Sequence, residues 1–170
     1  MHSAKPLKLM GFDVDGVLSD GRLYYANDGS EIKAFHTLDG QGLKMLRDAG
    51  ITLAIITGRR SGAVAARAKN LGIELLFQGI EDKRGTMAQI LAERGLSFAE
   101  AGYMGDDIVD LPLMRACGFS AAPANAHALV KQHAHYVASS KGGEGAVRDT
   151  CEAILQAQGK LDSILAAYLA

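Results

Sequence analysis

Short apolar runs alternate with longer amphipathic stretches along this chain. That alternation predicts a parallel sheet whose strands are connected by helices. We expect strands at residues 7–12, 51–56, 74–77, 101–104 and 118–121. The first two runs are apolar at almost every position, which indicates strands that are buried on both faces. The pattern therefore predicts an α/β fold, a doubly wound parallel sheet of the Rossmann-like type.

The amphipathic stretches predict the helices that cover this sheet. We expect them at residues 40–49, 61–71, 82–94, 110–116, 126–132 and 146–158. Gly50, Gly72 and Gly95 directly follow the first three of these stretches. Glycine is common just after a helix because it tolerates a left-handed backbone, so the three glycines support the predicted helix ends.

Residues 22–36 interrupt the alternation. Two extended pieces, 23–26 and 31–35, flank the sequence Asn-Asp-Gly-Ser, which is typical of a β-hairpin turn. Both faces of the hairpin carry apolar side chains, and a lone two-stranded hairpin is marginally stable in water. We therefore expect the hairpin to pack on another part of the structure, and another subunit is the candidate.

The composition is that of one globular domain. The 170 residues are 48% hydrophobic and 22% charged, which predicts a single domain over residues 1–170 with a hairpin insert at about 22–36. An amphipathic helical tail at about 160–170 is expected to pack on this domain; binding of a partner helix is the alternative. The net charge of −1 argues against nucleic acid and membrane surfaces as partners, which leaves small molecules. Two cysteines in apolar surroundings and the short apolar run near the N-terminus indicate a reduced, cytoplasmic protein.

Two carboxylates follow the first predicted strand, in the motif Asp-x-Asp-Gly at residues 13–16. Strand alternation aims Asp13 and Asp15 at the same side. Two acids this close repel each other unless a cation compensates their charge. Mg²⁺ prefers oxygen ligands and often keeps a substrate phosphate among them, so the motif predicts a magnesium site. A turn whose acids only cap a loop explains this motif equally well by itself.

Polar residues also follow the second and third predicted strands. Thr57, Gly58 and Arg59 precede a predicted helix, whose free N–H groups favour a bound anion such as a phosphoryl group. Lys83 lies at the start of the next helix, where a cation opposes the helix dipole and calls for an anionic partner. A solvated surface lysine is the alternative for Lys83.

Three acids follow the fourth predicted strand, at Asp106, Asp107 and Asp110. Helix capping accounts for one or two of them. The carboxyl ends of parallel strands lie at one edge of a sheet, where doubly wound sheets bind their ligands. We therefore expect all four clusters of polar residues to meet in one crevice.

This order of motifs resembles the haloacid dehalogenase superfamily of phosphotransferases, over about residues 7–158. Each motif alone is weak, but four in order, each after its strand, are specific. Within the superfamily, residues 15–21, 33–35, 39–40 and 142–148 are similar to the family of 3-deoxy-D-manno-octulosonate 8-phosphate (Kdo 8-phosphate) phosphatases of lipopolysaccharide biosynthesis. That resemblance implies a fold with no cap domain and a homotetramer, in which the hairpins associate and a neighbouring subunit helps to close each active site.

The chemistry of the side chains and the resemblance together predict catalytic roles. Asp13 is the expected nucleophile, which forms an aspartyl phosphate, and Asp15 is the expected acid and base. Mg²⁺ is expected on Asp13, the backbone carbonyl of Asp15 and Asp106. An acid at position 15 favours a phosphatase, since an alcohol leaving group needs a proton.

The remaining polar residues are expected to position the phosphate. Thr57 and the backbone of Gly58 hold phosphoryl oxygens, and Lys83 bridges the nucleophile and the phosphate. Asp107 and Asp110 orient the metal ligands and Lys83.

The resemblance also implies which residues contact the sugar acid. Beside Asp15, Gly58 and Lys83 at the phosphate, this set comprises His36, Thr37, Leu38, Asp39, Gly40, Lys44, Arg59 and Arg67. A phosphorylated sugar acid is a multivalent anion, which arginine binds through paired hydrogen bonds. For His36, Lys44 and Arg67, a position facing solvent is an equal alternative.

Other functions remain open at this point. A phosphorelay receiver domain also combines acids, a phosphorylated aspartate, a threonine and a lysine on a parallel sheet, but there the acidic pair and the phosphoacceptor lie on different strands. A non-catalytic scaffold is disfavoured by the complete polar set. Among enzymes, the main alternative is a phosphatase of a nine-carbon sugar acid such as N-acylneuraminate 9-phosphate.

Overall fold

Six parallel strands form the central sheet of the computed structural model, which describes residues 2–169. In sheet order they are β5 (Leu75–Gln78), β4 (Thr52–Thr57), β1 (Leu9–Phe12), β6 (Ala101–Met104), β7 (Phe119–Ala122) and β8 (Tyr136–Val137). The chain winds outward from the central strand β1 in both directions, so the predicted doubly wound sheet is confirmed. In such sheets the crevice for a ligand lies where the winding reverses, here at the carboxyl end of β1.

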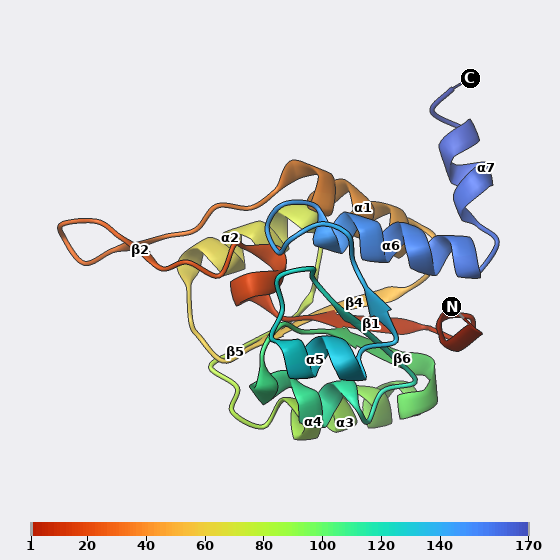
Figure 1. Cartoon of the computed structure of the whole chain (residues 1–170), viewed down its shortest axis with the longest axis horizontal. Coiled ribbons are helices and arrows are strands. Elements are labelled where there is room, and N and C mark those ends of the chain that lie inside the picture. Colours follow the sequence, from red (N-terminus) through yellow and green to blue (C-terminus); the bar gives the residue numbers. More distant parts are fainter. Residues whose placement is uncertain (1, 170) are drawn as a thin grey trace.

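Helices cover both faces of this sheet (Figure 1). On one face lie α1 (Thr37–Asp48), α2 (Gly62–Leu71) and α6 (Ala146–Ala157). On the other lie α3 (Lys83–Arg94), α4 (Leu111–Met114) and α5 (Ala128–His133). Consecutive residues of β1 alternate between the two resulting cores, since Met10 and Phe12 pack with the first set of helices and Leu9 with the second. This is the two-sided burial that the apolar runs predict.

Two of the predicted helices differ from the structure by more than a shift of one or two residues at an end. Helix α1 begins at Thr37, three residues before the predicted start, because His36 is already its N-cap and histidine is not among the preferred capping residues. The predicted helix 110–116 divides into a 3₁₀ turn, Ile108–Asp110, and the short α4. Asp107 and Asp110 form a capping box around that turn, so the acids of the motif determine the local structure.

The predicted hairpin is confirmed and extends away from the sheet (Figure 1). Strand β2 (Tyr24–Tyr25) pairs antiparallel with β3 (Glu31–Ile32). Tyr24, Tyr25 and Ile32 are exposed. Residues 2–169 contain no separate cap domain, and the packing of the hairpin on another subunit stays a prediction.

The C-terminal tail forms α7 (Leu161–Ala166), which points away from the rest of the chain (Figure 1). Leu161 and Ile164 pack against the core beneath α1 and α6, whereas Tyr168 and Leu169 are exposed. The tail is therefore held by the apolar contacts of its first part and, near its end, by a hydrogen bond of 2.8 Å from Gln41 Nε2 of α1 to the Tyr168 hydroxyl. Within residues 2–169, none of the helices has the length and apolar character needed to cross a lipid bilayer.

Candidate active site

A cavity of about 550 Å³ opens at the carboxyl ends of β1, β4 and β6. It is lined by residues from all four predicted clusters and from the loops beside them: Asp13, Asp15, Gly21, Thr57, Gly58, Arg59, Ile80, Glu81, Lys83, Asp106, Asp107 and Val109. The sequence predicts eight of these positions. The parallel topology thus brings the four motifs together at one edge of the sheet.

Asp13 directly follows β1 and continues its pairing, because its backbone N–H donates to the Met104 carbonyl at 3.0 Å. The chain then turns through residues 14–18, where Gly16 has φ +88°. A Cβ atom at Gly16 would overlap the Asp106 carboxylate. A glycine is therefore required here both for the backbone turn and for the close approach of Asp106 to the first motif.

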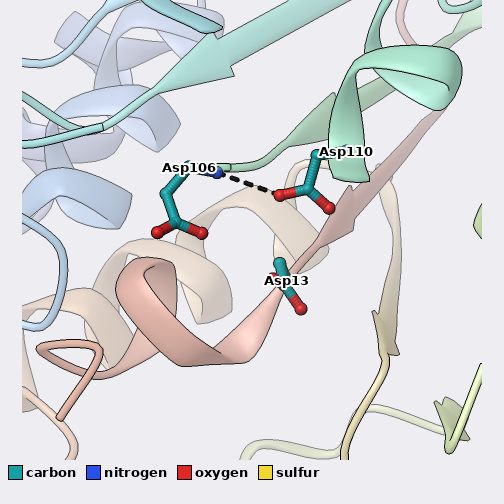
Figure 2. A group of neighbouring side chains, drawn as sticks. All are labelled: Asp13, Asp106 and Asp110. Carbon is teal, nitrogen blue, oxygen red and sulfur yellow. Dashed lines mark hydrogen bonds between the residues drawn. The ribbon is translucent and has the colours of Figure 1, made fainter. Parts of the chain in front are cut away.

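Three carboxylates meet at the floor of the cavity, and Figure 2 shows them. Oxygens of Asp13, Asp106 and Asp110 lie within 4.8 Å of one another. Asp110 is fully engaged by the chain, since its Oδ2 accepts from the backbone N–H of Asp106 at 3.1 Å and its Oδ1 accepts from Lys83 Nζ at 2.6 Å. By contrast, Asp13 Oδ1 is buried without a hydrogen bond. Asp13 and Asp106 therefore offer ligand oxygens, while Asp110 orients its neighbours.

Lys83 is the cation of this cluster. Its ammonium lies 3.1 Å from Asp13 Oδ1 and 2.6 Å from Asp110 Oδ1, and its side chain is 7% exposed. Burial opposes its charge, but Asp13 and Asp110 outweigh burial and raise the pKa of Lys83. The anionic partner that the sequence predicts is thus present, and the alternative of a solvated surface lysine is wrong.

The acids carry more negative charge than Lys83 neutralises. Burial and the neighbouring Asp110 raise the pKa of Asp13 to about 6, against the opposing effect of Lys83. Burial, Asp110 and Asp13 raise the pKa of Asp106 to about 7. Carboxylates that resist ionisation in this way favour a further cation. Asp13 Oδ1, which accepts no hydrogen bond and has the Lys83 ammonium at 3.1 Å, and the all-oxygen donor set fit a hard divalent ion such as Mg²⁺.

The loop after β4 lines one side of the cavity, where the sequence predicts that the phosphate binds. Thr57 is the buried last residue of this strand, and its carbonyl accepts from the Ile80 backbone N–H at 3.1 Å. A Cβ on Gly58 would come within 3.7 Å of the Ile80 carbonyl, which is ordinary contact, so space alone does not require glycine there. The loop leads to Ser61, the N-cap of α2, whose N–H donates to the Gln78 side chain at 2.7 Å.

Comparison with known proteins identifies the family of this chain. Residues 73–148 match the haloacid dehalogenase-like hydrolase family. The chain is 46% identical, over 95% of its length and 87% of the relative's, to the 3-deoxy-D-manno-octulosonate 8-phosphate phosphatase KdsC of Yersinia pestis. The chain belongs to the Kdo 8-phosphate phosphatase family. The same protein of Escherichia coli strain K12 is 43% identical over 94% of this chain and 85% of its own. The resemblance identified from the motifs is thereby confirmed.

Solved structures agree with this family assignment. A probable YrbI family phosphatase from Pseudomonas syringae superimposes with a TM-score of 0.97 at 54% identity, covering 99% of this chain and 96% of its own. The Kdo 8-phosphate phosphatase from Moraxella catarrhalis gives a TM-score of 0.95 at 42% identity, over 98% of this chain and 95% of its own. That relative was crystallised with a magnesium ion, a phosphate ion and a Kdo molecule.

Among the expected sugar contacts, Arg59 lines the cavity and the other seven do not. The set outside it comprises His36, Thr37, Leu38, Asp39, Gly40, Lys44 and Arg67. Arg67 donates to the His36 carbonyl at 3.2 Å, and the buried Asp39 accepts from the Arg148 N–H at 2.9 Å, at the start of α6. Both residues thus fix the beginning of α1, and their contact with a sugar acid stays a prediction.

Two charged residues beside the site were not predicted to take part in it. Lys33 contacts the carboxylate of Asp15, and Glu31 contacts both Lys33 and Arg59. Both come from the hairpin, where they lie two positions apart and so face the same side of an extended chain. This spacing could have shown from the sequence that Glu31 and Lys33 lie on one side of the hairpin, but it does not show which part of the structure they contact.

The free energy of unfolding should depend on pH through the ionisation of Asp13 and Asp106. In EDTA, we expect the free energy of unfolding to fall between about pH 5 and pH 7. The pKa values of about 6 for Asp13 and about 7 for Asp106 in the folded protein lie above the ordinary value of an aspartate. Over this pH range the folded state therefore still binds protons that the unfolded state has already lost, so rising pH destabilises the fold. Mg²⁺ should reduce this fall, because it selects the ionised carboxylates. Thermal unfolding across this range tests the prediction, and the slope in EDTA should be shallower in Asp106→Asn. A flat or rising curve for the unmodified protein in EDTA contradicts it.

Proposed function

We propose that this protein is a Mg²⁺-dependent phosphatase that hydrolyses Kdo 8-phosphate to Kdo and inorganic phosphate, a step of lipopolysaccharide biosynthesis. One observation carries the proposal: Asp13, Lys83 and Asp106 meet in one cavity of a chain that is 46% identical to a Kdo 8-phosphate phosphatase. The complex of the Moraxella catarrhalis relative with magnesium, phosphate and Kdo supports the choice of ion and sugar. We further propose that the protein is cytoplasmic and forms a homotetramer. The exposed aromatic residues of the hairpin support its association with other subunits.

In the first half of the reaction, a carboxylate oxygen of Asp13 attacks phosphorus. The new bond joins Asp13 to the phosphoryl group, and the bond between phosphorus and the sugar oxygen breaks. Asp15 gives a proton to the leaving sugar oxygen, because a free alkoxide is a poor leaving group. The products of this half are the sugar acid, the aspartyl phosphate on Asp13 and an ionised Asp15.

In the second half, water attacks the phosphorus of the aspartyl phosphate. Asp15 takes a proton from this water, the bond between Asp13 and phosphorus breaks, and inorganic phosphate leaves. Asp13 and Asp15 return to their starting protonation states. One pair of acids two residues apart therefore serves both displacements in turn.

The surrounding residues stabilise charge in both displacements. Lys83 lies against Asp13, where its ammonium can balance the charge that spreads over the phosphoryl oxygens. Thr57 and the backbone of Gly58 bind those oxygens from the other side of the cavity. Bound Mg²⁺, which Asp13, Asp106 and the backbone carbonyl of Asp15 would hold, supplies further positive charge at the phosphate.

A substrate panel tests the proposed function. We expect kcat/KM for Kdo 8-phosphate to exceed the values for nine-carbon sugar-acid phosphates and for simple hexose phosphates by about tenfold or more, since a site that recognises polar groups discriminates at least this well. A higher kcat/KM for N-acylneuraminate 9-phosphate would show that the proposed substrate is wrong, while the proposed phosphatase mechanism would stand. A single round of autophosphorylation and dephosphorylation, without turnover of any sugar phosphate, would instead favour a receiver-like signalling module.

A further inference from the structure

Four charged side chains of alternating sign form a closed ring at the edge of the cavity. Lys33 Nζ contacts the Asp15 carboxylate and lies 3.2 Å from Glu31 Oε1. Glu31 Oε2 accepts from Arg59 Nη2 at 2.6 Å, and Arg59 Nε lies 3.7 Å from Asp15 Oδ2, which closes the ring. Each charge thus has an opposite charge on both sides, and the ring as a whole is neutral.

The burial of Lys33 sets it apart from an ordinary surface lysine. Its side chain is 2% exposed, against 14% for Glu31, 20% for Asp15 and 44% for Arg59. Lysine is almost never fully buried unless it is paired, because its ammonium is strongly hydrated. The carboxylates of Asp15 and Glu31 replace the lost water around the Lys33 ammonium, and they therefore hold the ammonium between them.

The ring connects three separate segments of the chain. Asp15 follows β1, Arg59 follows β4, and Glu31 and Lys33 come from the hairpin strand β3 and the residues directly after it. Lys33 and Glu31 do not line the cavity, whereas Asp15 and Arg59 do. Lys33 therefore does not reach a substrate in the cavity, and any effect on the reaction passes through Asp15.

The contacts of Asp15 differ between its two oxygens. Oδ1 accepts from Lys33, whereas Oδ2 has Arg59 Nε at 3.7 Å, beyond hydrogen-bond distance. One oxygen is therefore fixed by the hairpin, and the other is left to exchange a proton.

We infer that Lys33 is a positioning residue for the reaction, which holds the Asp15 carboxyl so that Oδ2 meets the leaving sugar oxygen. This inference rests on the acid role of Asp15 in the proposed function.

The variant Lys33→Met tests this role, because methionine keeps much of the length of the side chain and removes its charge. The measured quantity is kcat/KM, which reports only the steps up to the transfer of the phosphoryl group to Asp13. It is compared between Kdo 8-phosphate and p-nitrophenyl phosphate, whose phenolate leaves without a proton. We expect a loss of about 100-fold on the sugar phosphate and almost none on the aryl phosphate. Lys33→Arg, which keeps the charge, should recover part of the loss.

A double variant shows whether Lys33 acts through Asp15. In the Asp15→Asn background, Lys33→Met should cause little further loss on the sugar phosphate, since two residues that act as a unit are not additive. Lys8→Met is the matched control: Lys8 forms an ion pair with Glu100 at 2.7 Å but is 63% exposed and away from the cavity. It should leave both substrates unaffected.

Several outcomes would overturn the inference. If Lys33→Met lowers kcat/KM equally on both substrates, as it would if the variant did not fold, then Lys33 stabilises the site and does not assist the leaving group. Additive losses in the double variant would show that Lys33 acts independently of Asp15. If the unmodified protein prefers another sugar phosphate, the same ratio is measured on that substrate, so the proposed substrate can fail while the role of Lys33 stands.

Discussion

Asp13→Asn is expected to abolish turnover, with kcat reduced by about 10⁴-fold or more. The amide oxygen of asparagine has the shape of the lost carboxylate oxygen but cannot act as a nucleophile toward phosphorus. The fold should persist, since the substitution removes one charge from a cluster in which Asp13, Asp106 and Asp110 repel one another. Release of inorganic phosphate measures the first effect, and thermal unfolding measures the second.

A matched substitution and a labelling experiment sharpen this test. Asp162→Asn changes an exposed acid in the first turn of α7, outside the cavity, and should keep full activity. Acid quenching during turnover of ³²P-labelled substrate should trap label on the unmodified protein and none on the Asp13→Asn variant. Activity of that variant within tenfold of the unmodified protein would remove Asp13 from the role of nucleophile.

The strands could be predicted because each buried strand is a run of consecutive, mostly apolar residues in the sequence. Strand β6 coincides with the predicted range 101–104, and the predicted starts of the other four strands lie within two residues of the observed ones. Strand β8 was missed because it has only two residues, too few for a pattern. It is held beside β7 by tertiary contacts, among them the hydrogen bond of 3.0 Å from the His135 N–H to the Ser120 carbonyl.

The catalytic residues could be predicted for a topological reason. Each of Asp13, Thr57, Lys83 and Asp106 ends a parallel strand, follows one or opens the helix after one, and the order of strands alone brings those positions to one edge. The positions of the other polar residues depend on features with no period in the sequence. The ring around Lys33 exists because Glu31 and Lys33 of the hairpin contact residues that follow β4 and β1, which no single stretch of sequence specifies.

The hairpin is therefore a second part of the candidate site and not only a surface for association. Tyr24 and Ile32 are paired across the hairpin and share one exposed face. Tyr25 is paired with Glu31 on the opposite face, and Glu31 and Lys33 contact Arg59 and Asp15. Tyr25 is also exposed, yet its hydroxyl accepts from Arg59 Nη2 at 3.2 Å, so it lies beside the charged ring. Substitutions on the exposed face should therefore be tested for their effect on catalysis as well as on assembly.

Lys83→Met should lower both activity and stability. We expect kcat/KM to fall by about 10³-fold, since the ammonium beside Asp13 no longer balances the phosphoryl charge. In EDTA at neutral pH, the free energy of unfolding should fall by about 3 kcal/mol, because Asp13 and Asp110 stay buried without their cation. The exposed Lys69 of α2 supplies the matched control, Lys69→Met.

A second substitution separates the two effects of Lys83→Met. Asp110 is fully buried, so in that variant it is the acid whose charge is compensated least. Adding Asp110→Asn removes this charge and should restore most of the lost stability, measured by denaturant unfolding, whereas kcat/KM should stay low because no cation has returned to Asp13. Recovery of activity together with stability would mean that Lys83 acts on the reaction only by keeping the site folded. A single variant with unchanged stability would show that the ion pairs of Lys83 do not support the fold at all.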